Sequence, residues 1–258
     1  MTGAVRRGGG GLSVLLLLVA AAVAVQAQAW VIARVSFYIG EVGARKSGTE
    51  EWAQVALKQP LFSGDAIRTA AESRLEIKVD EESVVRIGEN SELEITKPNL
   101  MNLAGGETQA KLKKGKIWSN VKKMAEDQRR MTVSTPTVVA AIRGTVFRID
   151  VPEDSLTVLR VYEGSVEARE NRVAPAAGGL REVRPPGEVA PPAEVSVQEW
   201  VQIVAANQQL TFRRGGTPQL VTFDPEVDAL IEWVRWNRER DAQGIPPGLR
   251  EEPERKDK

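Results

Sequence analysis

The stretch "TPTVVAAIRGTVFRID", residues 135–150, contains two runs of alternating apolar side chains that are out of phase with each other. The runs lie at even positions before the arginine and at odd positions after it: Val138, Ala140 and Ile142, then Phe147 and Ile149. Successive side chains of a strand point to opposite faces, so one straight strand cannot bury both runs. Gly144 tolerates the dihedrals of a bulge or corner, and we predict such a corner at Arg143 and Gly144.

Two roles are open for Arg143 at this corner. Its guanidinium carries five donors, which suits it to hold loop carbonyls or a neighbouring carboxylate. Alternatively, the side chain is exposed and meets an anionic ligand or a partner protein.

Strand patterns also occur upstream of this stretch. "SRLEIKVD", residues 73–80, alternates apolar and charged side chains, and "ELEIT", residues 92–96, does the same. Short alternating segments separated by Gly, Asp, Asn and Ser are typical of an all-β domain.

The strand patterns repeat along the chain. Residues 79–91 resemble residues 151–165, with Val79 matching Val151 and Arg86 matching Arg160 after a two-residue insertion. A glycine followed by a short strand occurs three times, as Gly40-Glu41-Val42, Gly115-Lys116-Ile117 and Gly164-Ser165-Val166. Units of one or two strands bury their apolar face by stacking, so the pattern predicts a β-solenoid or β-roll-like stack. An ordinary β-sandwich is the alternative.

"TPTVVAAIRGTVFRIDV", followed by "LTVLRVYEGSVEA", resembles the core of FecR-type periplasmic domains. The resemblance covers about residues 35–170, and its structural motif residues are Thr135, Pro136, Thr137, Gly144, Thr145, Phe147 and Gly164. It implies a β-solenoid-like periplasmic module that works through protein contacts, with no known catalytic residues to transfer. The founding members of that family regulate sigma factors through a cytoplasmic region. Here 11 residues precede the apolar run, so we expect an exported form without the anti-sigma region.

The N-terminus has the pattern of a secretory signal. Arg6 and Arg7 precede a 14-residue apolar run, residues 12–25, and small residues follow at the spacing of a cleavage site. The run is shorter than the ~20 residues that span a bilayer. We predict a signal peptide at 1–29 and a periplasmic or extracellular protein. An uncleaved membrane anchor is the alternative.

The remaining chain divides by composition. We expect a FecR-like β domain at 30–173, a Pro/Gly/Ala-rich linker at 174–195, a helical segment at 196–243 and a disordered tail at 244–258. Ser196 and Glu199 form a capping box that predicts a first helix. A hairpin is expected around Gly215-Gly216. A second helix should begin with Asp224 as N-cap and Pro225 at its first position.

The second helix has apolar side chains on two faces. Val227, Leu230, Ile231 and Val234 share one face, and Trp233 and Trp236 lie near the opposite face. If the first face packs on the β domain, the tryptophans meet a partner. The alternative is a helix clamped within the chain, with both faces buried.

Composition excludes several kinds of site. The chain has no cysteine and no histidine, which removes disulfides, thiolate and imidazole chemistry and the usual zinc ligands. The 35 basic and 35 acidic residues balance, so the net charge provides no long-range electrostatic attraction for nucleic acid. The acidic residues show no calcium-loop spacing, and neither metal nor cofactor is expected. Lysines and arginines around Trp118 suit an acidic partner or glycan, or are solvated surface.

We therefore expect a non-enzymatic binding, scaffold or signalling-accessory module of the cell envelope. Arg143, Trp118, Trp233 and Trp236 are the candidate contacts for an unknown envelope protein or glycan, and the oligomeric state is open. One alternative is a carboxylate-dependent glycan hydrolase. Another is a membrane-tethered sensory module with an uncleaved N-terminal helix.

Overall fold

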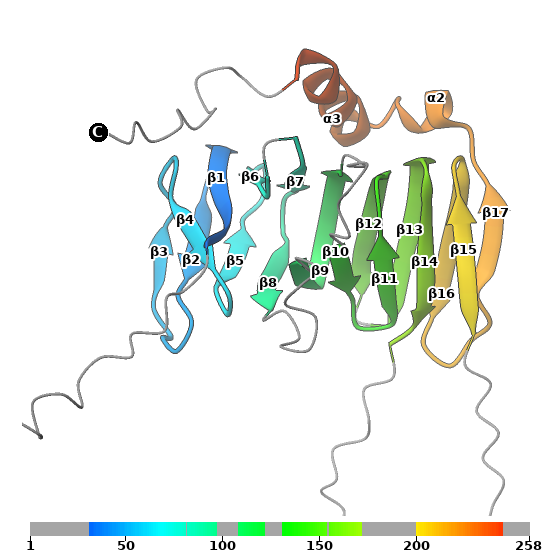
Figure 1. Cartoon of the computed structure of the whole chain (residues 1–258), viewed down its shortest axis with the longest axis horizontal. Helices are drawn as coiled ribbons and strands as arrows, with labels where there is room; N and C mark the ends of the chain where they lie inside the picture. The colour runs from blue at the N-terminus through cyan, green and yellow to red at the C-terminus, as the bar shows by residue number, and fades with distance from the viewer. Residues whose placement is uncertain are drawn as a thin grey trace, which may run out of the picture. The chain divides into compact units, whose positions relative to one another are not determined.

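A computed structural model describes residues 31–80, 82–96, 108–121, 131–153, 155–171 and 200–244. The predicted signal peptide, the linker and nearly all of the tail lie outside these residues. The described chain is mainly β, with two helices near its C-terminal end, as the sequence predicts (Figure 1). None of its helices is long and apolar enough to cross a membrane.

The strands form two open sheets, which we call sheet A and sheet B. In order of pairing, sheet A contains β4 (Pro60–Phe62), β1 (Val31–Ile39), β6 (Arg74–Lys78), β7 (Val84–Ile87), β9 (Thr108–Asn120), β12 (Val146–Glu153), β13 (Leu156–Glu163), β16 (Gln208–Arg213) and β17 (Gln219–Thr222).

Sheet B contains β3 (Trp52–Gln54), β2 (Val42–Arg45), β5 (Ala66–Thr69), β8 (Glu92–Thr96), β9, β10 (Met131–Ser134), β11 (Val138–Ile142), β14 (Ser165–Glu170) and β15 (Val201–Ala205). Strand β9 belongs to both sheets. Its pairing with β10 is parallel, and all the other pairings are antiparallel.

Glycines mark several of the places where the chain passes between the sheets. Within β9, residues up to Lys114 pair in sheet B and residues from Gly115 pair in sheet A, and Gly115 has φ +90°. The predicted corner is confirmed: β11 lies in sheet B, β12 lies in sheet A, and Gly144 between them has φ +64°. The other two glycines of the repeated unit, Gly40 and Gly164, also sit at passages, from β1 to β2 and from β13 to β14.

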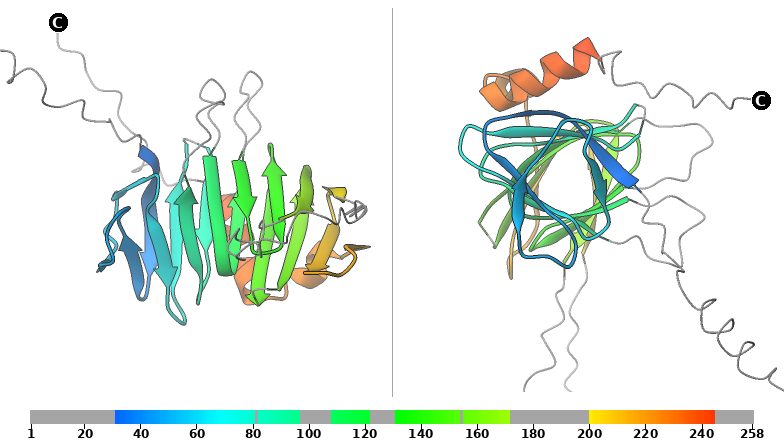
Figure 2. Two further views of the ribbon diagram at one scale, coloured as in Figure 1. Left: turned by 90° about the horizontal axis from the view of Figure 1, so that it is seen from below. Right: turned by 90° about the vertical axis from the view of Figure 1, so that its left-hand side faces the viewer.

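The inward sides of both sheets form one apolar core, which the strands surround in the end view of Figure 2. Phe147 and Ile149 of β12 are fully buried there, and so are Ala140 and Ile142 of β11. The phase change at the corner therefore keeps both runs facing the same core. The similar segments 79–91 and 151–165 each contain the second strand of a sheet-A hairpin, β7 or β13.

The prediction of a helix starting at Ser196 is wrong over the residues that the structure describes. Val201–Ala205 form β15, which pairs with β14, and Val204 is buried while Val201 and Ile203 are exposed. The free edge of β14 offers backbone hydrogen bonds to this segment, and a helix-capping pattern in the local sequence cannot reveal such a non-local partner. The hairpin around Gly215-Gly216 is confirmed as β16–β17.

The second helix begins where predicted but is divided in two. Asp224 accepts a hydrogen bond from Glu226 N, and Pro225 opens α2 (Pro225–Asp228). Ile231 is extended, with φ −68° and ψ 123°, and α3 (Glu232–Gln243) follows it. The break ends the 100° periodicity, so the predicted packing face is wrong: Val227, Leu230 and Ile231 are exposed, and Val234 alone of the four is buried.

Candidate interaction site

A row of polar and aromatic side chains crosses the outer face of sheet A. The register places five residues opposite one another on successive strands: Glu76, Arg86, Trp118, Arg148 and Arg160. Their sequence neighbours point into the core, so the row follows directly from strand alternation. Such positions are usually solvated, but here α2 and α3 lie over them, and the first four residues are at most 5% exposed.

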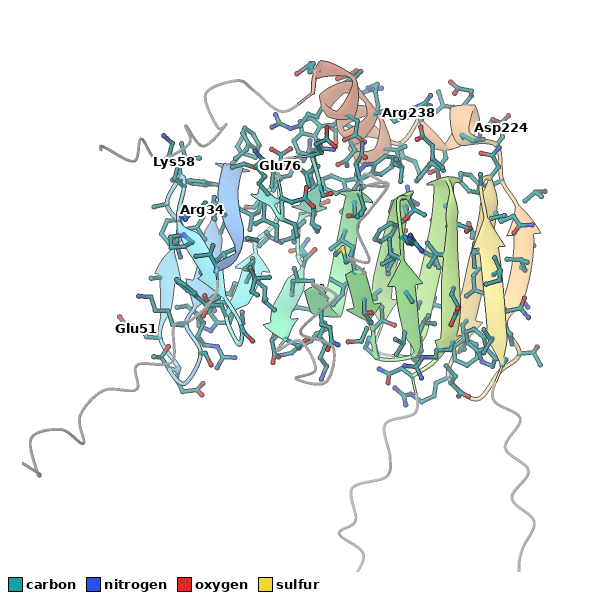
Figure 3. The ribbon with its side chains drawn as sticks, in the orientation of Figure 1. Arg34, Glu51, Lys58, Glu76, Asp224 and Arg238 are labelled. Carbon is teal, nitrogen blue, oxygen red and sulfur yellow. The ribbon has the colours of Figure 1, made fainter. Side chains whose placement is uncertain are left out.

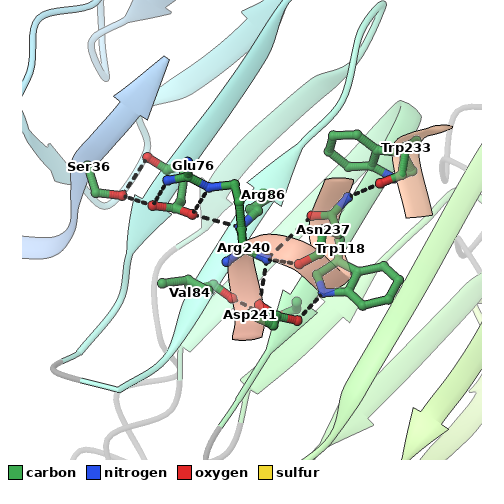
Figure 4. A network of polar contacts seen from close by, with 10 residues as sticks. Ser36, Glu76, Val84, Arg86, Trp118, Trp233, Asn237, Arg240 and Asp241 are labelled. Atoms are coloured by element: carbon green, nitrogen blue, oxygen red, sulfur yellow. Dashed lines mark hydrogen bonds and ion pairs between the residues drawn. The ribbon is translucent and has the colours of Figure 1, made fainter. Parts of the chain in front are cut away.

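At one end of the row, Glu76 joins two arginines. Arg86 Nε donates to its Oε2 over 2.6 Å, and Arg240 of α3 donates to both carboxylate oxygens over 3.1 Å (Figure 4). Ser36 Oγ adds a hydrogen bond of 2.8 Å. Burial opposes ionisation, but the bonds from Arg240 and Arg86 outweigh it and hold the pKa of Glu76 below its usual value. Glu76 lies on the α3 side of the sheet (Figure 3).

Asp241 of α3 binds the centre of the row. Its Oδ1 accepts from Arg86 Nη1 over 2.6 Å, and its Oδ2 accepts from Trp118 Nε1 over 2.9 Å. Arg86 Nη1 also donates to Asn237 O over 3.3 Å. One carboxylate thus satisfies a buried guanidinium and a buried indole at once.

Asp228 at the end of α2 binds the other half of the row. Its Oδ2 accepts from Arg148 Nη1 over 3.1 Å and from Tyr162 Oη over 2.5 Å. Asp150 Oδ2 accepts from both Arg148 and Arg160. Burial, with the hydrogen bond to Asp228, raises the pKa of Tyr162 far above its usual value, so Tyr162 stays a neutral donor.

A small aromatic cluster, separate from the main core, completes the contact. Trp118, Val146, Trp233 and Val234 are its buried members. Trp233 and Trp236 stack with ring centroids 5.4 Å apart, and the Arg74 guanidinium lies 4.8 Å from the Trp236 centroid. Arg74 also forms an ion pair with Glu232 of α3. The C-terminal segment is therefore held by charge pairs and aromatic contacts together.

A cavity of about 280 Å³ lies at the edge of this contact. Its lining is of mixed charge: Glu72, Arg74, Glu89, Lys116, Glu232 and Trp233. Lys116 Nζ pairs with Glu89 over 3.1 Å, and Arg74 pairs with Glu232. The two basic side chains that line the cavity are thus each paired with an acidic side chain of the same lining.

The four predicted partner-binding residues do not come together. Arg143 is exposed at the corner, and no hydrogen bond or ion pair joins it to another described residue, so the expected ties to loop carbonyls are not seen there. Trp118 and Trp233 are buried at 1% and 5% exposure, and Trp236 is half-buried against Phe37 and Arg74. In this conformation Arg143 is the one of the four that is exposed. Partner binding by all four stays a prediction.

The FecR motif residues sit at turns and in the core. Thr135 and Thr137 are buried between β10 and β11, and each shares a hydrogen bond with Thr157 Oγ1, at 2.8 and 2.6 Å. A Cβ on Gly164 would come within 2.7 Å of the Gly144 carbonyl oxygen. The two corners therefore stack in direct contact, with Thr145 buried beside them.

Two of the described lysines near Trp118, Lys113 and Lys116, form ion pairs with glutamates of the upstream segment. Strand β8 pairs with β9, and Lys113 Nζ lies 2.9 Å from Glu92 and 3.3 Å from Glu94. Lys122, Lys123, Arg129 and Arg130 of the basic stretch lie outside the described residues. No group of three or more metal-ligating side chains occurs within the described ranges.

Sequence reasoning missed the residues that bind α3 to sheet A. Arg86 and Arg160 matched each other in the repeat, and Glu76 fell on the polar phase of its strand. The recurrence of these polar residues at outward-facing strand positions was the sequence feature from which the row could have been predicted. The identity of the covering element was not predictable, because Asp228 and Asp241 lie more than 65 residues away from every member of the row.

Comparisons with known proteins agree with the predicted family. Residues 65–167 match the family model described as FecR protein, which confirms the predicted resemblance over that range. The chain is also similar to two crystal structures of a "putative anti-sigma factor" from Parabacteroides distasonis ATCC 8503. No curated protein matches the chain.

Both structural similarities are distant. The first structure is 14% identical over 64% of this chain and 63% of its own length, with a TM-score of 0.44. The chain thus spans less than two thirds of that protein. The second is 15% identical over 69% of this chain and 74% of its own, with a TM-score of 0.45.

Proposed function

We propose that this chain, which carries a FecR region over residues 65–167, is an exported, non-enzymatic binding or signalling-accessory module of the cell envelope. The FecR match is the observation that carries the proposal. It coincides with the stacked part of the fold, from β5 to β14, and with the corner at Arg143 and Gly144.

The strand order supports the predicted β-solenoid or β-roll. The chain passes repeatedly between sheet A and sheet B, and each passage adds a strand beside the previous one. Stacks of this kind present long, continuous surfaces and commonly act by binding. The exposed Arg143 corner is such a surface feature, with a guanidinium that suits a carboxylate or phosphate.

The disposition of the carboxylates favours binding over glycan hydrolysis. A hydrolase needs two carboxyl groups that face an open cleft and remain free to exchange protons. Glu76 of the row and Asp228 and Asp241 of the C-terminal segment each bind an arginine of the row where the segment covers sheet A. They stabilise the fold in this arrangement.

Crosslinking in intact cells tests the binding role. A photo-crosslinking residue at position 143 should capture an envelope protein or glycan, whereas the same residue at the exposed position 46 serves as the matched control. A specific product at 143 that is absent at 46 supports the proposal. No product at either position contradicts binding through the corner.

An activity assay tests the alternative. The exported chain, incubated with peptidoglycan fragments, should release no new reducing ends. If new reducing ends appear, and a variant lacking one carboxylate no longer produces them, the chain is a glycan hydrolase and the binding role is wrong.

A further inference from the structure

Exposed large apolar side chains gather in the C-terminal part of the described chain. Seven of the ten lie between residues 201 and 231: Val201, Ile203, Leu220, Val221, Val227, Leu230 and Ile231. Strands β15 and β17, which supply four of them, are the last strands of sheets B and A. Figure 1 shows both strands at the same end of the molecule.

Strand β17 is an edge whose own four residues carry none of the usual protection, and Pro218 directly precedes it. Its four residues, Gln219 to Thr222, are all exposed and uncharged, and its pairing with β16 has no bulge. Natural edges normally carry lysine, proline or a bulge, which prevents pairing with another chain. At the opposite end of the molecule, β4 begins with Pro60, and β3 follows Glu50 and Glu51 directly.

The hydrogen-bond pattern shows which groups of β17 are available. Phe223 N donates to Asn207 O over 3.0 Å, and Thr222 is paired with Gln208. Bonded and non-bonded pairs alternate in an antiparallel ladder, so Val221 bonds to β16. The N–H and C=O groups of Leu220 and Thr222 therefore point away from sheet A, and within the described residues no strand accepts them.

We propose that β17 pairs with β17 of a second copy of this chain, antiparallel, about a two-fold axis through Val221. Leu220 of one copy then lies opposite Thr222 of the other, and both outward-pointing pairs form their hydrogen bonds. The two Val221 side chains meet at the axis in a non-bonded pair, where apolar contacts are closest.

The charges beside β17 fit this arrangement. Arg214 lies in the turn before the strand, and Asp224 follows the strand at its other end; both are exposed. With the axis through Val221, Asp224 of each copy lies opposite Pro218 of the other, on the side of the turn that holds Arg214, whose Nη2 also donates to Pro136 O. Identical surfaces with one charge of each sign at opposite ends are self-complementary under a two-fold axis.

Neighbouring registers are less favourable. An axis through Leu220 would place Thr222 opposite Pro218, which has no N–H to donate. An axis through Thr222 would place Leu220 opposite Asp224, which caps α2 and has left the strand. Val221 is thus the axis position that uses both available residues of the edge.

Solution mass tests the dimer. The exported chain, purified as the cell produces it, should show a mass by sedimentation equilibrium that rises with concentration to twice that of the chain. Val221→Lys should weaken the dimer at least about tenfold, because two lysines would face each other at the axis. Ala53→Lys, an exposed change on β3 at the opposite edge, is the matched control and should leave the mass unchanged. Thermal melts establish that both variants fold.

Crosslinking tests the register. The chain has no cysteine, so Val221→Cys introduces a single thiol at the axis, where opposite Cβ atoms lie about 4.5–5.5 Å apart, close to disulfide range. Mild oxidation should give a covalent dimer, and Ala53→Cys should not. A monomer at every concentration overturns the proposal, and is also the result if another part of this chain or a different protein covers β17. Equal crosslinking of the two variants overturns the register. Neither result bears on the envelope role, which rests on different residues.

Discussion

Glu76 and Glu92 show how burial decides what a single ion pair contributes to the stability of the fold. Glu76 is buried and binds Arg86 and Arg240, whereas Glu92 is partly exposed and binds Lys113. Removing one partner of a buried pair leaves an uncompensated charge, but an exposed pair contributes little. Glu76→Gln should therefore lower the free energy of unfolding by about 3–5 kcal/mol. Glu92→Gln, the control, should change it by less than about 1 kcal/mol. Equal effects in urea unfolding would show that the pair under α3 is not buried in solution.

Glu76 also gives the stability a specific pH dependence. Its folded-state pKa lies below the ordinary value of 4.5, so its contribution is present above that value and is lost as the pH falls through the folded-state pKa. The gap in melting temperature between the wild type and Glu76→Gln should be constant near neutral pH and shrink below about pH 4.5. A gap that stays constant or widens toward acid would contradict the lowered pKa.

A substitution at Gly144 tests whether the corner depends on glycine. Its φ of +64° is costly for a β-branched side chain, so Gly144→Val should lose about 1–3 kcal/mol of stability. Arg143→Ala is the neighbouring control. The side chain is exposed and binds no other described residue, so its removal should cost less than about 0.5 kcal/mol. If Gly144→Val melts like the wild type, the corner does not depend on glycine.

At the scale of elements, α3 is held as a clamp on sheet A. Trp233→Ala should cost about 3–5 kcal/mol, because Trp233 is 5% exposed and packs beside Trp118 and Val234. Trp236→Ala should cost less, since Trp236 is half-buried. Leu230→Ala, at 78% exposure, should have almost no effect. Thermal melts with mass measurements check this. If Trp233→Ala melts like the wild type but no longer associates with a partner, the tryptophans form an interface and do not hold α3.

The elements that were predictable from sequence are those with local causes. Alternation identified strands of the β domain, the phase change at Gly144 identified one corner, and Asp224 with Pro225 identified the start of α2. The helix expected from Ser196 failed because sheet pairing with β14, a non-local cause, fixes residues 201–205 as a strand. The row under α3 was missed for the same reason: its residues follow strand alternation, but their burial depends on Asp228 and Asp241, which are distant in sequence.

At the scale of the whole molecule, the two ends of the paired sheets differ. The N-terminal end has a proline and nearby acidic residues at its edge strands, and the C-terminal end has the uncharged β17. This difference is the basis for the proposed pairing through β17. The Arg143 corner, where the chain passes from sheet B to sheet A, is exposed.

N-terminal sequencing of the chain recovered from fractionated cells tests whether this module works outside the cytoplasm. We expect a soluble envelope fraction whose chain begins near Gln28 or Trp30, as the small residues at the cleavage spacing indicate. A full-length chain with Met1 or Thr2 intact in the membrane fraction would instead show the tethered form. A full-length chain in the cytoplasm would contradict export.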